Sequence, residues 1–290
     1  MPDAVHVIGA TGRSGLALCR ALLDDGVAVV PVVRDAAKWA AEGSQPRPRV
    51  ADLAEAAQLR AALTEATRVV SCAHASHAAG VLAAAPSGAG FVFLGSTRKF
   101  TRWPDAHGLG VIAGETAFLA SGRPGVMLHP TMIYGAQAED NVQRLAALVR
   151  RLPLVPLPGG GRSLVQPIHQ DDVTRAIRAA LDHAWDGPRA LVLAGPEPVA
   201  YADFVRAVAA AAGLAPPRIV SIPGRALIAL APLAARIGGL PRVGADEARR
   251  LLEDKAFEIG PMRSLLGIEP VPLVDGLART FARTHKQSFA

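Results

Sequence analysis

The chain has 290 residues, of which 50% are hydrophobic and 19% charged, a balance typical of a folded globular protein and not of a disordered one. The net charge of +6 comes from scattered basic residues with no block of like charge, so we expect no nucleic-acid-binding surface. The two cysteines, Cys19 and Cys72, have neither the spacing nor the context of a disulfide or zinc site, which is typical of a reducing cytoplasm.

No targeting or membrane segment is expected. The glycine motif described below starts at Gly9, too early to leave room for a signal peptide. The apolar run Leu227–Ile237 is short and interrupted by Pro232, so it does not predict a membrane span. We therefore expect a cytoplasmic protein.

A glycine-rich turn connects the first predicted strand, Ala4–Ile8, to a helix whose leucines recur at helical spacing up to Gly26. Strand, glycine turn and helix form the context of a dinucleotide-binding loop, in which a pyrophosphate meets the N–H groups of the helix N-terminus. The alternative is an ordinary glycine-rich turn. The candidate cofactor-binding residues here are Gly9, Thr11, Gly12, Arg13, Ser14 and Gly15.

The spacing of these glycines is Gly-x-x-Gly-x-x-Gly, whereas ordinary dinucleotide dehydrogenases have Gly-x-Gly-x-x-Gly. This version resembles the short-chain dehydrogenase/reductase superfamily. The form GATGRSG resembles its extended and atypical branches, which include NmrA-like proteins and the relatives of the complex I subunit NDUFA-nine. The resemblance implies a Rossmann fold that binds NAD(P).

Short apolar runs alternate with helical patterns along the chain, which predicts an α/β fold with a doubly wound parallel Rossmann sheet. We assign residues 1–135 to a dinucleotide-binding domain. Residues 136–290 are expected to return partly to the sheet and to form a smaller C-terminal substrate lobe. The further strands are predicted at Val27–Val33, Arg49–Ala51, Arg68–Cys72, Phe91–Leu94, Gly125–His129 and Leu191–Ala194.

The choice between NADP and NAD depends on the residues after the second strand, where the adenosine ribose is recognised. Arg34, together with Arg13, would bind the 2′-phosphate of NADP. Asp35 would either bind the 2′-OH of NAD or cap the helix predicted at Ala36–Ala41. We favour the capping role for Asp35, and therefore NADP as the cofactor, with NAD less favoured. The alternative is that Arg13 and Arg34 are both simply solvated and bind no phosphate.

Two further strand ends supply cofactor candidates. In the resembling superfamily an Asp-Leu pair after the third strand flanks the adenine ring, and Asp52-Leu53 matches it, although Asp52 could also cap the helix predicted over residues 53–63. The end of the fourth strand should face the cofactor, because open α/β sheets bind ligands at the carboxyl ends of their strands. It ends in Cys72, Ala73 and His74.

The catalytic pattern of the superfamily is incomplete in this chain. Members that reduce or epimerise carry a Ser or Thr after the fifth strand, then Tyr-x-x-x-Lys, then a Glu four residues beyond the Lys. Here Ser96 or Thr97 supplies the hydroxyl and Glu115 matches the glutamate. The Tyr position is then His107 and the Lys position Val111. The missing pair favours the atypical branch.

Other residues could replace the missing pair. Ser96 would orient a carbonyl, and His107 would donate a proton unless it is only an exposed residue at the start of the helix predicted around Ala113–Ser121. Lys99 could place a cation near the nicotinamide ribose. The aromatic Phe100 and Trp103 would form either a wall of the substrate site or a lid.

Two later motifs resemble the extended branch. The stretch His129–Gly135 is similar to an Arg-Pro-x-x-x-Tyr-Gly loop whose proline lies against the nicotinamide, which makes Pro130 and Thr131 cofactor candidates. A second stretch is similar to His-Val-x-Asp-Val, in which the His and Asp cap and anchor a helix. We therefore interpret His169 and Asp172 as structural.

The sequence thus favours an NADP(H)-binding atypical short-chain dehydrogenase/reductase acting on a small carbonyl, quinone or related compound. The first alternative is a non-catalytic NADP(H)-sensing or scaffold protein of the NmrA-like type, and the second is a nucleotide-sugar epimerase or dehydratase. No group of His, Cys and carboxylate residues has metal-ligand spacing. A homodimer is possible, because helices of this fold often pair two subunits.

Overall fold

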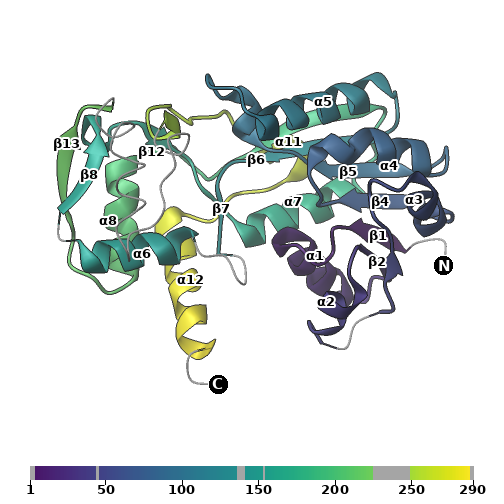
Figure 1. Cartoon of the computed structure of the whole chain (residues 1–290), viewed down its shortest axis with the longest axis horizontal. Coiled ribbons are helices and arrows are strands. Elements are labelled where there is room, and N and C mark those ends of the chain that lie inside the picture. Colours follow the sequence, from purple (N-terminus) through teal and green to yellow (C-terminus); the bar gives the residue numbers. More distant parts are fainter. Residues whose placement is uncertain (1–3, 44–45, 136–140, 153, 225–248, 288–290) are drawn as a thin grey trace.

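The computed structural model describes residues 4–43, 46–135, 141–152, 154–224 and 249–287. Its centre is a seven-stranded sheet in the order β11-β6-β5-β4-β1-β2-β3, and all the neighbouring strands are parallel (Figure 1). The predicted return of the chain to the sheet is β11, which pairs with β6. The strands are β1 (Val5–Ile8), β2 (Val29–Val33), β3 (Arg49–Val50), β4 (Arg68–Ser71), β5 (Gly90–Leu94), β6 (Gly125–Pro130) and β11 (Pro188–Leu193).

Helices cover both faces of this sheet, so side chains that alternate along a strand enter different cores. On β1, for example, Val5 and Val7 pack into one core and Ile8 into the other. The predicted doubly wound α/β fold is therefore confirmed. One face carries α1 (Arg13–Asp24), α7 (Gln170–Asp182) and α11 (Gly260–Leu266), and the other α3 (Ala56–Leu63), α4 (Ala78–Ala84) and α5 (Ala106–Ala120); α2 (Ala36–Ala40) follows β2.

A smaller lobe lies beside the sheet, at the left of Figure 1, and has its own apolar clusters around Phe204 and Val205. It contains a parallel pair of strands, β8 (Leu154–Pro158) and β13 (Arg218–Ile222), with α6 (Asn141–Arg151), α8 (Tyr201–Ala211) and α12 (Leu273–Gln287). Short pairs β7 (Ile133–Tyr134) with β10 (Ile168–His169), and β9 (Leu164–Val165) with β12 (Val199–Ala200), complete the strands.

The helix predicted around Ala113–Ser121 begins earlier, at Ala106, where the Asp105 carboxylate caps it by accepting from the Gly108 N–H at 2.8 Å. Glycines obscure this start in the sequence because they are poor helix formers. One of these glycines, Gly114, is required where α5 packs against Ala75, because a Cβ at position 114 would lie 1.9 Å from the Ala75 carbonyl oxygen.

None of the helices in the described ranges is long and apolar enough to cross a bilayer. The apolar run Leu227–Ile237 lies outside those ranges.

Candidate functional site

The glycine loop between β1 and α1 is built so that helix and strand approach closely. Gly9 has φ +75°, and the Gly12 N–H donates to its carbonyl oxygen at 2.9 Å. A Cβ at Gly15 would lie only 2.2 Å from the same oxygen. A larger residue at position 15 would therefore displace α1 from the sheet.

The N-terminus of α1 fits the pyrophosphate of a dinucleotide. Its N-cap, Gly12, is exposed and provides no side-chain cap, so the first-turn N–H groups can meet an anion. Ser14 has another contact: its hydroxyl donates to the Gln170 side-chain oxygen at 2.9 Å and so links α1 to α7. Thr11 is half-buried at the turn.

The two arginines expected at the adenosine phosphate have different surroundings. Arg34 is exposed directly after β2. Asp35 caps α2, its carboxylate accepting from the N–H groups of Ala37 at 2.9 Å and Lys38 at 3.1 Å, so the predicted N-cap is confirmed. Arg13 lines a groove of about 360 Å³ between α1 and α7. The expectation of a 2′-phosphate site therefore rests mainly on Arg34.

Asp52 forms a turn ahead of α3 and not a helix cap, which corrects that alternative. Its carboxylate accepts from the Ala54 N–H at 2.9 Å, whereas α3 begins at Ala56 with Glu55 as the N-cap. Leu53 is half-buried and packs against the core under α3 and α4. Both residues remain candidates for the adenine site.

The end of β4 lies against the glycine loop. The Cys72 N–H donates to the Ile8 carbonyl oxygen at 2.9 Å, and a Cβ at Gly9 would lie 3.1 Å from the Ala73 nitrogen. Burial raises the pKa of the Cys72 thiol, so it is not a nucleophilic thiolate. His74 caps the short helix that follows by accepting from the Ser76 N–H at 3.3 Å.

Ser96 stands at the carboxyl end of β5 and is held from two sides. Its Oγ accepts from the Arg98 N–H at 3.1 Å, and its own N–H donates to His129 Nδ1 at 3.1 Å. Gly95 makes this packing possible, because a Cβ there would lie 2.3 Å from the same nitrogen of His129. The Ser96 hydroxyl proton is then free to be donated to a ligand.

A charged cluster lies behind Ser96. Lys99 Nζ donates to both carboxylate oxygens of Glu115, at 2.6 Å for Oε1, and His129 Nε2 lies 3.1 Å from Oε2. Val111, at the position of the family's lysine, is buried. A loop lysine thus pairs with the glutamate. Burial, and then the charge of Lys99, lower the pKa of His129 to about 4, so this imidazole is neutral at pH 7.

A cavity of about 630 Å³ lies at the carboxyl ends of β5 and β6. Ser96 and Thr131 line it on the sheet side, and Arg250, Lys255 and Phe257 line it on the other. Thr131 donates its hydroxyl proton to the Gln166 carbonyl oxygen at 2.5 Å, and Pro130 is the last residue of β6. This cavity is the candidate substrate site.

His107 is not among the described residues that line this cavity. It is exposed in the first turn of α5 and packs edge-on against His74, with the ring centroids 4.4 Å apart. Burial, and then the neighbouring His74, lower its pKa, which reduces the fraction of the imidazole that carries a donatable proton near neutral pH. The geometry therefore favours Ser96 over His107 as the group that meets a substrate.

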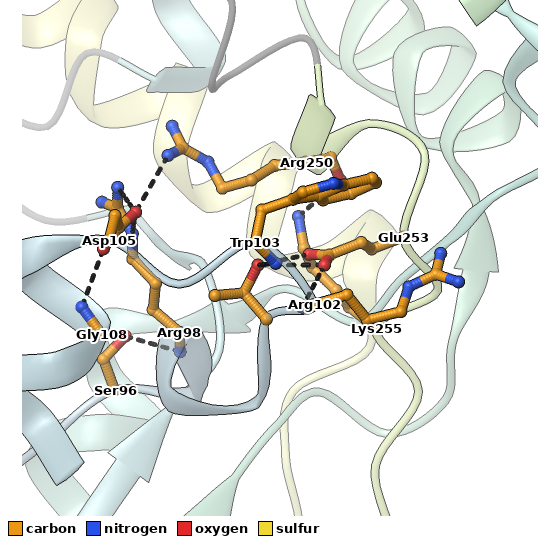
Figure 2. Close-up of polar contacts among 10 residues, drawn as sticks. Ser96, Arg98, Arg102, Trp103, Asp105, Gly108, Arg250, Glu253 and Lys255 are labelled. Atoms are coloured by element: carbon orange, nitrogen blue, oxygen red, sulfur yellow. Dashed lines mark hydrogen bonds and ion pairs between the residues drawn. The ribbon is translucent and has the colours of Figure 1, made fainter.

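The C-terminal segment is attached to the loop after β5, as Figure 2 shows for Arg102 and Glu253. Glu253 accepts from the Thr101 hydroxyl at 2.9 and 3.0 Å and from the Arg102 N–H at 2.6 Å. Phe100 packs on Phe257 with the ring centroids 5.6 Å apart. Phe100 thus lines the cavity and also contacts the C-terminal segment. Glu253 is a part of the site that sequence analysis missed, because no local motif marks it.

The structural roles expected for His169 and Asp172 are confirmed. His169 Nδ1 accepts from the Asp171 N–H at 3.1 Å and so caps α7. The fully buried Asp172 accepts from the Val271 N–H at 2.9 Å and anchors the chain ahead of α12. Within the described residues, no group of three or more His, Cys, Asp or Glu side chains is arranged to hold a metal ion.

Comparison with known proteins gives a sequence match in the first part of the chain. Residues 9–108 match the family model described as NAD(P)H-binding. A search of curated proteins found no match.

Solved structures share the whole fold. The protein gox2253 is 20% identical, with 98% of each chain covered and a TM-score of 0.75. UDP-glucuronic acid 4-epimerase from Bacillus cereus, in complex with UDP-glucuronic acid and NAD, is 17% identical, with 98% of this chain and 99% of that chain covered and a TM-score of 0.72. The NADPH-dependent quinone oxidoreductase QOR2 from Escherichia coli, complexed with NADPH, is 18% identical, with 96% and 99% covered and a TM-score of 0.72. At these low identities, the TM-scores establish that the chain shares the overall fold of these proteins.

Proposed function

We propose that this chain is an NADP(H)-dependent oxidoreductase acting on a small carbonyl, quinone or related compound. The premise is its Rossmann fold, of the kind found in atypical short-chain dehydrogenases/reductases, together with the NAD(P)H-binding match over residues 9–108. The observation that carries this proposal is the position of Ser96, which lines a cavity of about 630 Å³ at the carboxyl ends of β5 and β6. Open α/β sheets bind their ligands at this edge.

The chain would hold the cofactor through the glycine loop, with the pyrophosphate at the exposed N-terminus of α1. Bound NADPH supplies the hydride. Arg34 would bind the 2′-phosphate, since Asp35 is already used as the cap of α2.

Ser96 would orient the substrate. Its oxygen is occupied by the Arg98 N–H, so the hydroxyl donates its proton toward the substrate oxygen and polarises the carbonyl. His129 holds the Ser96 backbone from behind and, being neutral, places no positive charge there. His107 remains a second candidate donor through a water molecule.

The test is calorimetric titration of the protein with NADPH and NADH, followed by incubation of the NADPH complex with a panel of quinones, aldehydes and ketones. We expect tight NADPH binding and oxidation by at least one compound. Ser96→Ala should then lower kcat/KM by about 100-fold. The exposed Ser264 gives a matched control, and Ser264→Ala should leave kcat/KM unchanged.

The titration also separates the alternatives. Tight binding without turnover of any panel compound would favour the NADP(H)-sensing or scaffold function. The absence of the Tyr and Lys pair also supports that alternative. Failure to bind either nucleotide would contradict the proposed function at the glycine loop.

A further inference from the structure

The walls of the cavity at the ends of β5 and β6 differ in chemistry. Ser96 and Thr131 place hydroxyl-bearing side chains on the sheet side. Phe100 and Met132 are large apolar side chains that stay 53% and 36% exposed, and both line the cavity. The cavity is also lined by four cations, Arg98, Arg102, Arg250 and Lys255, which together form its cationic wall.

The two carboxylates that line the cavity are used by donors of the chain itself. Glu253 accepts from the Thr101 hydroxyl and the Arg102 N–H, and Asp254 accepts from the Leu164 N–H at 2.8 Å. They hold loops together and keep their negative charges, but the cavity lining has four cations, Arg98, Arg102, Arg250 and Lys255, against these two carboxylates, so positive charge is in excess.

Lys255 is a half-buried cation of this wall, and its hydrogen-bond partner differs from that of Arg98. Arg98 has Asp105 as its partner, through Nε at 2.7 Å, whereas Lys255 Nζ donates to a neutral acceptor, the Arg250 carbonyl oxygen, at 3.1 Å (Figure 2). Burial lowers the pKa of Lys255; Arg250 and Arg98 lower it further, and Glu253 opposes them. A second, negatively charged partner would stabilise this ammonium.

We propose that the cavity binds a carbonyl compound that carries an acidic group, a carboxylate or a phosphate, which pairs with Lys255 while the carbonyl faces Ser96. The apolar body of the compound would lie against Phe100 and Met132. This inference rests on the proposed function and adds to it the class of substrate.

A matched pair of probes tests the charge alone. Phenylglyoxylate and its methyl ester share the carbonyl and the aromatic ring, but only the acid is charged. Calorimetric titration of the NADP⁺-loaded protein should show the acid binding at least about tenfold more tightly than the ester, since charge-assisted pairs are the strong ones. Phenyl phosphate, titrated in parallel, shows which acidic group is preferred: tighter binding of either anion than of the ester supports the proposal.

The variants Lys255→Met and Lys255→Arg assign the effect to one side chain. Lys255→Met should reduce the preference for the acid to about twofold or less, and Lys255→Arg should restore it. The exposed Arg206 on α8, paired with Asp203, gives a control that removes one positive charge away from the cavity, and Arg206→Met should keep the wild-type preference. An equal affinity for acid and ester, or an unchanged preference in Lys255→Met, would overturn the proposal.

The same titrations without nucleotide separate this inference from the proposed function. If NADPH does not bind but the acid is still preferred in a Lys255-dependent manner, the oxidoreductase function fails and the anion site stands. If NADPH binds and no anion does, the anion site fails and the oxidoreductase function stands.

Discussion

Lys99 and Glu115, 16 positions apart in the chain, form an ion pair in which the lysine Nζ donates to both carboxylate oxygens. The two side chains are only 15% and 14% exposed. In the family pattern the lysine lies on the same helix as the glutamate, at the position of Val111. In this chain Val111 occupies that position, and the loop after β5 supplies the lysine that pairs with the glutamate.

Removing one partner of this pair should be costly. Glu115→Leu should lower the free energy of unfolding by about 3 kcal/mol, because an ammonium is left without its partner in a poorly solvated place. The double variant Lys99→Met/Glu115→Leu should lose clearly less. Urea denaturation measures both, with Asp186→Ala in the exposed Arg189–Asp186 pair as a control expected to change by about 0.5 kcal/mol or less. Additive losses would show that the two residues are not coupled.

Stability should fall in mild acid because of His129. Its pKa is lowered to about 4 in the folded chain, and the unfolded chain has an ordinary value of about 6.5. The unfolded chain therefore binds a proton first, and stability decreases as the pH falls from about 6.5 to about 4, by about 3 kcal/mol. Above pH 7 the imidazole is neutral in both states and contributes no pH dependence.

Because the pKa values of His6 and His107 are also lowered, the contribution of His129 must be isolated by difference. His129→Asn keeps an acceptor for the Ser96 N–H but does not titrate. Its unfolding free energy, measured from pH 4 to pH 7, should vary less steeply than that of the wild type. Parallel curves would rule out His129 as the source.

The glycine loop should not tolerate a methyl group at position 15. Gly15→Ala places a Cβ 2.2 Å from the Gly9 carbonyl oxygen, a main-chain atom that cannot move aside. We expect a loss of about 2 kcal/mol or more in stability and weaker NADPH binding. Gly88→Ala is the matched control, since open space surrounds that position. NADPH affinity and thermal unfolding are the measurements, and wild-type values for Gly15→Ala would refute the close approach of helix and strand.

Arg34 should decide the preference for NADPH. Arg34→Ala should weaken NADPH binding by about tenfold or more while leaving NADH binding nearly unchanged, because only NADPH carries the 2′-phosphate. Asp35→Asn keeps the side-chain oxygen that caps α2 and should alter neither affinity. If Asp35→Asn instead weakens NADH binding, the aspartate reads the ribose of NAD. Titration calorimetry with both nucleotides distinguishes the two.

The sequence by itself determined the parts of this protein that depend on local pattern. The short apolar runs mark the strands of the sheet, because strands buried on both faces need continuous apolar residues. The glycine turn identifies the β1–α1 loop, since its spacing is a requirement of one backbone geometry. The cap by Asp35 is also local, within three residues of its donors.

Tertiary structure alone decided which distant residues share the site. Nothing near Thr101 in the sequence points to Glu253, 152 positions away, yet the two are hydrogen-bonded in the wall of the cavity. The Lys99–Glu115 pair likewise depends on how α5 packs against the loop after β5. Helix α5 also places His107 against His74, and His107 is not among the described residues that line the cavity. Such contacts follow from the order of strands and the packing of helices across the sheet, which no periodicity along the chain encodes.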